Sequence, residues 1–157
     1  WIKHRPGLAL HDVERELAML PINPGIGMTV RALQEKGTRT VIISGGLDLI
    51  AEKLARQYGF DAWWSNGLEA DGSGRLTGEG VLRVELCNKI KALQEAQRMF
   101  GASPERTAAI GNSSIDVSMF QGSALGIAFN PIDEEVVRGA HHVIRGPCLS
   151  AVLDLLL

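Results

Sequence analysis

One stretch of the chain combines a buried strand, a polar turn and a carboxylate. Residues 107–110 (Thr-Ala-Ala-Ile) have the character of a buried strand, and the turn that follows contains Asn112 and ends at Asp116. A strand–turn–helix unit places such side chains at the carboxyl edge of a parallel sheet, where open α/β folds keep their sites. Both residues offer oxygens, which suit a hard cation such as Mg²⁺. The same turn could instead simply begin a helix, with Ser113 or Ser114 as N-cap and Asp116 as a first-turn acid.

A second candidate site is the turn Ser44-Gly45-Gly46, which follows a β-branched run at residues 41–43. Glycine lets a phosphate approach the backbone N–H groups, and the serine hydroxyl adds one hydrogen-bond donor. A tight turn without any function can have the same composition. This motif alone therefore does not distinguish phosphate binding from a structural role.

Lys89 is the third candidate, because it lies in the first turn of a predicted helix that is capped by Asn88. A cation is unfavourable at the positive end of a helix dipole unless an anion shares the site. The alternative is a lysine that points into solvent, as Lys91 could do. The usual phosphate-loop and dinucleotide-binding motifs do not occur in the sequence.

Strand and helix patterns alternate along the chain. Strands are predicted at residues 39–44, 60–65, 107–110, 125–129 and 141–144. Helices are predicted at residues 10–20, 26–36, 47–59, 88–100, 134–138 and 149–157. This alternation predicts a parallel sheet with helices on both faces. A glycine-rich turn within residues 66–80 predicts a β-hairpin, which we interpret as a surface flap.

Composition indicates one soluble globular domain, with 157 residues of which 45% are hydrophobic and 22% are charged. A formal net charge of −2 gives no electrostatic basis for binding nucleic acid or an anionic membrane surface. No apolar run is long enough to span a membrane, and no signal peptide is visible. Cys87 and Cys148 lack the spacing of metal ligands and are too few for a disulfide framework. These features favour the cytoplasm.

The three motifs together resemble those of the haloacid dehalogenase superfamily, and within it the phosphoserine phosphatase group. Residues 41–46 resemble the second motif of the family, whose serine binds the transferred phosphoryl group. Lys89 falls where the third motif has a phosphate-neutralising lysine, and residues 111–116 resemble the fourth motif, Gly-Asp-x-x-x-Asp, which holds Mg²⁺. The resemblance implies a Rossmann-like core over residues 23–157, preceded by the remnant of a small helical cap over residues 1–22.

Two departures from the family pattern concern the chemistry. The first motif, Asp-x-Asp-x-Thr, supplies the nucleophilic aspartate and its acid/base partner, and it does not occur in this sequence. Asn112 stands where the fourth motif has its first aspartate. Its amide oxygen can still coordinate a cation but brings no charge, so Mg²⁺ should bind more weakly. Ile115 also replaces an asparagine that is often found in phosphoserine phosphatases.

The resemblance implies hydrolysis of a small phosphorylated metabolite, with phosphoserine as the leading substrate, through an aspartyl-phosphate intermediate. Ser44 and Lys89 would act in catalysis, Gly45 and Gly46 would join them in binding phosphate, and Asn112 and Asp116 would hold Mg²⁺. Two alternatives remain open. One is a catalytically impaired relative with a binding or regulatory role, and the other is a phosphotransferase that passes the phosphoryl group to an alcohol.

The missing first motif also predicts a gap in the sheet. In the family, the strand that carries this motif lies between the strand that ends in Ser44 and the strand that ends in Gly111. We expect an upstream segment, or a strand from a second chain, to fill this place and bring the nucleophile. Buried unpaired backbone groups cost on the order of 1–3 kcal/mol each, so residues 1–157 alone should not form a stable monomer.

Overall fold

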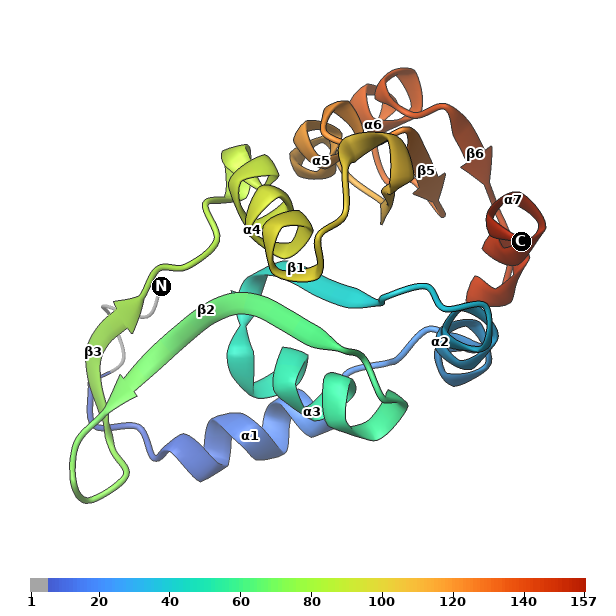
Figure 1. Cartoon of the computed structure of the whole chain (residues 1–157). Helices are drawn as coiled ribbons and strands as arrows, with labels where there is room; N and C mark the ends of the chain where they lie inside the picture. Colours follow the sequence, from blue (N-terminus) through green and yellow to red (C-terminus); the bar gives the residue numbers. More distant parts are fainter. Residues whose placement is uncertain (1–5) are drawn as a thin grey trace.

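Two three-stranded sheets form the framework of the computed structural model, which describes residues 6–157 (Figure 1). The first sheet has the order β1 (Val41–Leu47), β2 (Ala62–Ala70) and β3 (Leu76–Val81), with β1 parallel to β2 and β3 antiparallel. The second has the order β4 (Ala108–Gly111), β5 (Leu125–Phe129) and β6 (His142–Ile144), all parallel. The predicted α/β class is confirmed.

Helices alternate with the strands, as the sequence predicts. The α-helices are α1 (Leu10–Ala18), α2 (Ile26–Glu35), α3 (Asp48–Tyr58), α4 (Ile90–Phe100), α5 (Val117–Gln121), α6 (Glu134–Gly139) and α7 (Leu153–Leu156). Short 3-10 helices are η2 (Leu86–Asn88), η3 (Pro104–Arg106), η4 (Ser114–Asp116) and η5 (Leu149–Val152). The predicted cap at Asn88 is wrong, because α4 begins two residues later and the Asn88 amide instead donates to Glu85 (3.4 Å).

The predicted gap lies between the two sheets. β1 and β4 are the outer strands of separate sheets, and within residues 6–157 they form no ladder with each other. From Val41 to Gly46 no residue of β1 is fully buried, although the first three are β-branched. Parallel strands in the middle of an α/β sheet are normally buried on both faces. β1 and β4 therefore each leave one strand edge without a partner.

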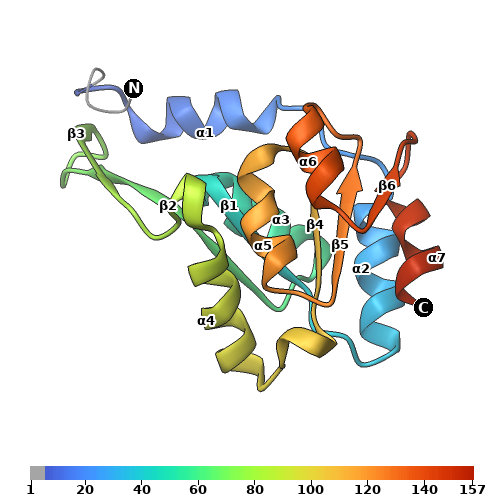
Figure 2. The same cartoon turned by 90° about the horizontal axis from the view of Figure 1, so that it is seen from above.

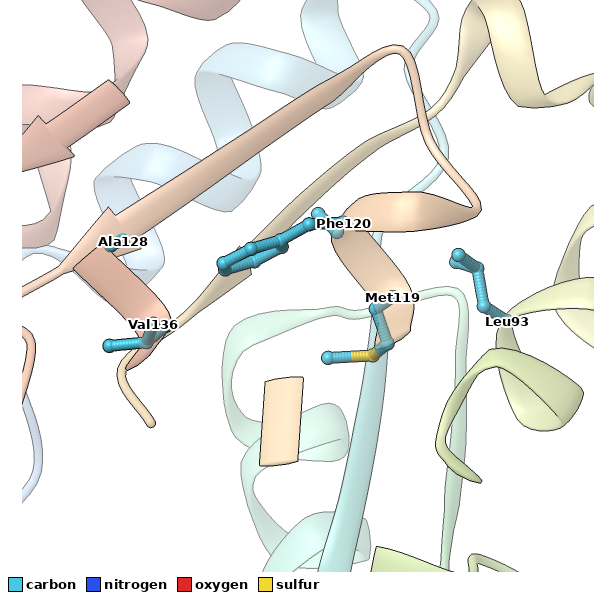
Figure 3. Close-up of a cluster of buried hydrophobic side chains, with 6 residues drawn as sticks. Leu93, Met119, Phe120, Ala128 and Val136 are labelled. Atoms are coloured by element: carbon cyan, nitrogen blue, oxygen red, sulfur yellow. The ribbon is translucent and has the colours of Figure 1, made fainter. Parts of the chain in front are cut away.

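The second sheet carries the best-packed core of the described chain. On one face, a cluster joins α4, α5 and α6 to the strands (Figure 3); its members are Leu93, Ala109, Met119, Phe120, Ala128 and Val136. On the other face, Ile127 and Phe129 pack against Val152 of η5. Successive residues of β5 thus point to opposite faces, as expected for a strand that is covered by helices on both sides.

Helix α1 belongs to the side of the first sheet. It lies along α3 (Figure 1) and has no fully buried residue. The segment before it joins the β2–β3 hairpin, where Gly7 N donates to Leu76 O (2.7 Å) and Ala9 bridges Arg75. Helix α2 lies instead beside α7, next to the second sheet (Figure 2). No helix within residues 6–157 has the length and apolar character needed to cross a membrane.

Candidate active site

A buried ion pair joins two of the predicted site residues. Lys89, at the junction of η2 and α4, places its Nζ 2.6 Å from Oδ1 of Asp116. Only 8% of the lysine side chain and 7% of the aspartate side chain are exposed. Because burying an unpaired charge is costly, each group depends on the other for its place in the interior. Lys89 is therefore not a solvated lysine, whereas Lys91 is exposed and pairs with Glu85 at 2.9 Å.

The second carboxylate oxygen of Asp116 organises the turn that precedes it. Oδ2 accepts hydrogen bonds from Asn112 N (2.9 Å) and Ser113 N (3.2 Å), and the Ser113 hydroxyl lies 3.4 Å away. Ser113 is the N-cap of η4 and forms a capping box with Asp116, so the helix-start interpretation also holds. A side chain at Gly111 would collide with Asp116. Asp116 thus serves as both a capping acid and the partner of Lys89.

The Ser44–Gly46 turn is held against β2 by side chains. Ile43 pairs with Trp64 and Leu47 pairs with Asn66, so the register shifts and Ser65 alone lies opposite the turn. Ser65 Oγ donates to Gly46 O and Asn66 Nδ2 donates to Gly45 O, both at 2.9 Å. Such irregularities in a strand often occur next to active sites, where they redirect side chains.

The hydroxyl of Ser44 is turned toward its own loop. It accepts a hydrogen bond from Gly46 N (3.0 Å), which leaves its proton available for another acceptor. Gly45 lies against Leu86 of η2, and η2 contacts η4. The structure therefore links Lys89, Asn112 and Asp116 by direct hydrogen bonds, and Leu86 of η2 connects the Ser44 turn to the element that leads to Lys89.

The structure gives weaker support for Asn112 and Asp116 as ligands of a metal ion. Asn112 is exposed, and both oxygens of Asp116 already accept hydrogen bonds. Across residues 6–157, no three side chains of the His, Cys, Asp and Glu types gather where a metal ion could be held. These residues could supply only part of a Mg²⁺ site, and Asp116 acts here through Lys89 and the turn.

Sequence patterns missed the residues that hold the turns in place. Asn66 makes hydrogen bonds to Gly45 and to the loop that precedes η2. Asp133, the N-cap of α6, accepts from Ser114 N (2.8 Å) and Val136 N (2.9 Å). These two hydrogen bonds hold the pKa of the Asp133 carboxyl below its ordinary value. Asn66 directly follows the strand predicted at residues 60–65, and nothing in the local pattern indicated these contacts.

Comparison with known proteins adds independent support. The family model described as haloacid dehalogenase-like hydrolase matches residues 2–121. Phosphoserine phosphatase SerB2 of Mycobacterium tuberculosis is 36% identical over 156 residues, covering 96% of this chain and 36% of its own length. A phosphoserine phosphatase of Archaeoglobus fulgidus is 34% identical over 125 residues, covering 79% of this chain and 36% of its own length. The chain therefore spans only about a third of these relatives.

Solved structures agree with this assignment. A crystal structure of phosphoserine phosphatase in its apo form superposes with a TM-score of 0.90 and 26% identity, over 98% of this chain and 76% of the other. A phospho-aspartyl intermediate analogue of phosphoserine phosphatase gives a TM-score of 0.89 and 26% identity, over 98% of this chain and 73% of the other. The chain therefore belongs to the haloacid dehalogenase-like hydrolases, in the group that resembles phosphoserine phosphatases.

Proposed function

We propose that the protein hydrolyses a small phosphomonoester through an aspartyl-phosphate intermediate, with phosphoserine as the leading substrate. The observation that carries this proposal is the buried Lys89–Asp116 pair, which is connected to the Ser44–Gly46 turn through Leu86 of η2. A lysine in a buried position, next to a glycine turn, is suited to binding a phosphoryl group. The names of the relatives and the phospho-aspartyl analogue support the same chemistry.

Ser44 and Lys89 would bind the phosphoryl oxygens. The ammonium group of Lys89 has three donors, of which Asp116 takes one, so two remain for phosphate. The hydroxyl of Ser44 can donate its proton. The missing side chain at Gly45 makes room for Leu86, whereas the missing side chain at Gly46 leaves space for close approach to the turn. Charge neutralisation of the equatorial oxygens is the main task of the protein in phosphoryl transfer.

None of the candidate site residues described above is the nucleophilic aspartate, so another segment would supply it. An aspartate carboxylate would form a bond to phosphorus as the bond to the ester oxygen breaks, and that oxygen would leave as an alcohol after protonation. Water would then release phosphate and regenerate the carboxylate. We propose that a strand inserted between β1 and β4 brings this aspartate, because both strands offer an unpaired edge there. An upstream segment or a second chain could supply it.

Mg²⁺ is the cation that we propose for this site, where it would stabilise negative charge on the phosphoryl group. Asn112 would contribute its amide oxygen, and carboxylates from the inserted strand would complete the ligand set. We further propose that residues 6–22 belong to a small cap, the predicted range 1–22 beginning outside the described residues, and that the β2–β3 hairpin is a flap at the rim. We also propose a cytoplasmic location, to which the free thiols of Cys87 and Cys148 would be suited.

Binding of inorganic phosphate tests the assignment directly. In the intact protein, Lys89→Met and Ser44→Ala should each weaken phosphate affinity, by about tenfold or more for the lysine. Lys91→Met is the matched control, because it removes an exposed lysine only two residues away, in the first turn of α4. Equal losses for Lys89→Met and Lys91→Met would rule out a phosphate site at Lys89. Release of phosphate from O-phosphoserine is the second measurement.

Asn112 favours one competing function, a relative that binds phosphorylated metabolites without hydrolysing them. The neutral amide stands where a carboxylate would hold the cation, and it is exposed at the site. Phosphate binding that depends on Lys89, together with no release of phosphate from O-phosphoserine, would identify this alternative.

A further inference from the structure

The side chain of Asn66 connects three segments around the candidate site. Its Nδ2 donates to Gly45 O (2.9 Å) and Val84 O (3.0 Å), and its Oδ1 accepts from Arg83 N and Val84 N, both at 2.8 Å. These four hydrogen bonds use both donors and both acceptor positions of the amide. Asn66 itself is not among the predicted site residues, although one of its partners, Gly45, is.

Asn66 replaces backbone hydrogen bonds that the strands cannot make. Regular pairing of β1 with β2 is interrupted between Ile43 and Leu47, so the Ser44–Gly46 turn lies outside the regular ladder. In place of the missing ladder bonds, the side chains of Asn66 and Ser65 donate hydrogen bonds to the carbonyl groups of Gly45 and Gly46, respectively. Without them, these carbonyl groups would have no partner in a partly buried position, which costs free energy.

The other end of the Asn66 amide holds the segment that leads to Lys89. Val84 is 1% exposed, so the loop is anchored at this point, and Lys89 follows five residues later through η2. Arg83 adds a second tie, since its guanidinium donates to Ser65 O (3.0 Å) and Asp48 (2.9 Å). The Asn66 side chain thus connects the turn that carries Ser44 to the segment that leads into Lys89.

We propose that Asn66 is a positioning residue, which sets the distance between the Ser44–Gly46 turn and Lys89 and thereby the fit of the phosphoryl group. The proposal rests on the phosphate-binding function given above. Asn66 does not itself touch the phosphate. It acts through Gly45 and Val84, and small displacements of binding groups reduce phosphate binding strongly.

The test compares Asn66→Ala with Gln97→Ala in the intact protein, using inorganic phosphate as the probe. Gln97 is a matched control, because its buried amide also joins two segments, through Thr107 Oγ1 (3.0 Å) and Gly122 O (2.9 Å), but away from the site. We expect Asn66→Ala to weaken phosphate affinity about tenfold or more and Gln97→Ala less than about twofold. In ¹⁵N-labelled protein, the amide resonances of Gly45 and Gly46 should shift only in Asn66→Ala.

Ser65→Ala is a milder variant that keeps the proposal testable if Asn66→Ala does not fold. It removes one hydrogen bond to the same turn and should weaken phosphate affinity by about twofold to fivefold. Wild-type affinity in Asn66→Ala, or equal losses in Asn66→Ala and Gln97→Ala, would overturn the positioning role. A wild-type protein that does not bind phosphate, or binds it independently of Lys89, would instead overturn the proposed function beneath it.

Discussion

The two sheets differ in how completely each is packed. In the sheet of β4, β5 and β6, Ile127 and Ala128 are fully buried and a cluster covers each face, one of which is drawn in Figure 3. In the sheet of β1, β2 and β3, residues 41–46 of β1 remain partly exposed. The apolar sequence of β1 is suited to a buried strand, so its exposure indicates a missing neighbour. The second sheet has its own core, whereas the first sheet leaves β1 partly exposed, which is where we propose that a further strand inserts.

The largest expected effect is on folding itself. Residues 1–157 alone should show no cooperative thermal unfolding as a monomer, because unpaired groups in β1 and β4 offset much of the about 5–15 kcal/mol that stabilises a domain. Thermal unfolding and amide hydrogen exchange measure this, with fast exchange expected in β1 and slower exchange in β5. A stable monomer with equal protection in both strands would contradict the dependence on an inserted strand.

The next prediction compares the removal of one large apolar side chain beside each of the two sheets. Phe120→Ala should lower the free energy of unfolding by about 3–5 kcal/mol, because Phe120 is 1% exposed in the core of the second sheet. In the intact protein, Ile42→Ala should cost more than the about 1 kcal/mol expected for its half-buried position, because the inserted strand would bury it further. Urea unfolding of the intact protein at one temperature measures both variants. A cost of only about 1 kcal/mol for Ile42→Ala would contradict an inserted strand beside β1.

A smaller effect is expected at the end of β4, where a carboxylate can be restored. Asn112→Asp should tighten Mg²⁺ binding by about tenfold and raise any phosphatase activity of the intact protein, because it adds a charged oxygen ligand. Mg²⁺ titration by calorimetry measures the affinity of both proteins. Ser114→Asp is a control that adds the same charge two residues away. Equal affinities for Asn112→Asp and wild type would mean that residue 112 faces away from the metal.

The sequence predicted the elements and the gap, because both depend on local patterns and motif order. β-Branched runs and helical periodicity are properties of neighbouring residues, and the strands at 125–129 and 142–144 appear within one residue of expectation. The Lys89–Asp116 pair and the bonds of Asn66 join residues that are 27 and 17–21 positions apart. Such long-range partners cannot be found from local patterns. The turns were therefore predicted, whereas the side chains that hold them in place were not.

The smallest predicted effect concerns acid stability in the first sheet. Burial raises the pKa of Asp61, but hydrogen bonds from Thr40, Arg39 and Gln34 outweigh it and hold that pKa below its ordinary value of 3.8. A lowered folded-state pKa gives stability that is present above the ordinary value and is lost as the pH falls through the folded-state pKa. Asp61→Asn should therefore destabilise the protein more near neutral pH than at about pH 3. Urea unfolding at both pH values measures this, and an equal loss at both would contradict it.

The open edge of β1 also has a consequence for behaviour in concentrated solution. Residues 41–46 contain no charge and no proline, and β-branched residues fill the first half of the strand. An exposed edge with this composition is a template for self-association, because another copy can add its own strand to it. A strand that occupies the gap would therefore protect the protein from aggregation as well as complete the sheet. Protein in which a strand fills the gap beside β1 should therefore stay monomeric at higher concentrations than protein in which the gap is open.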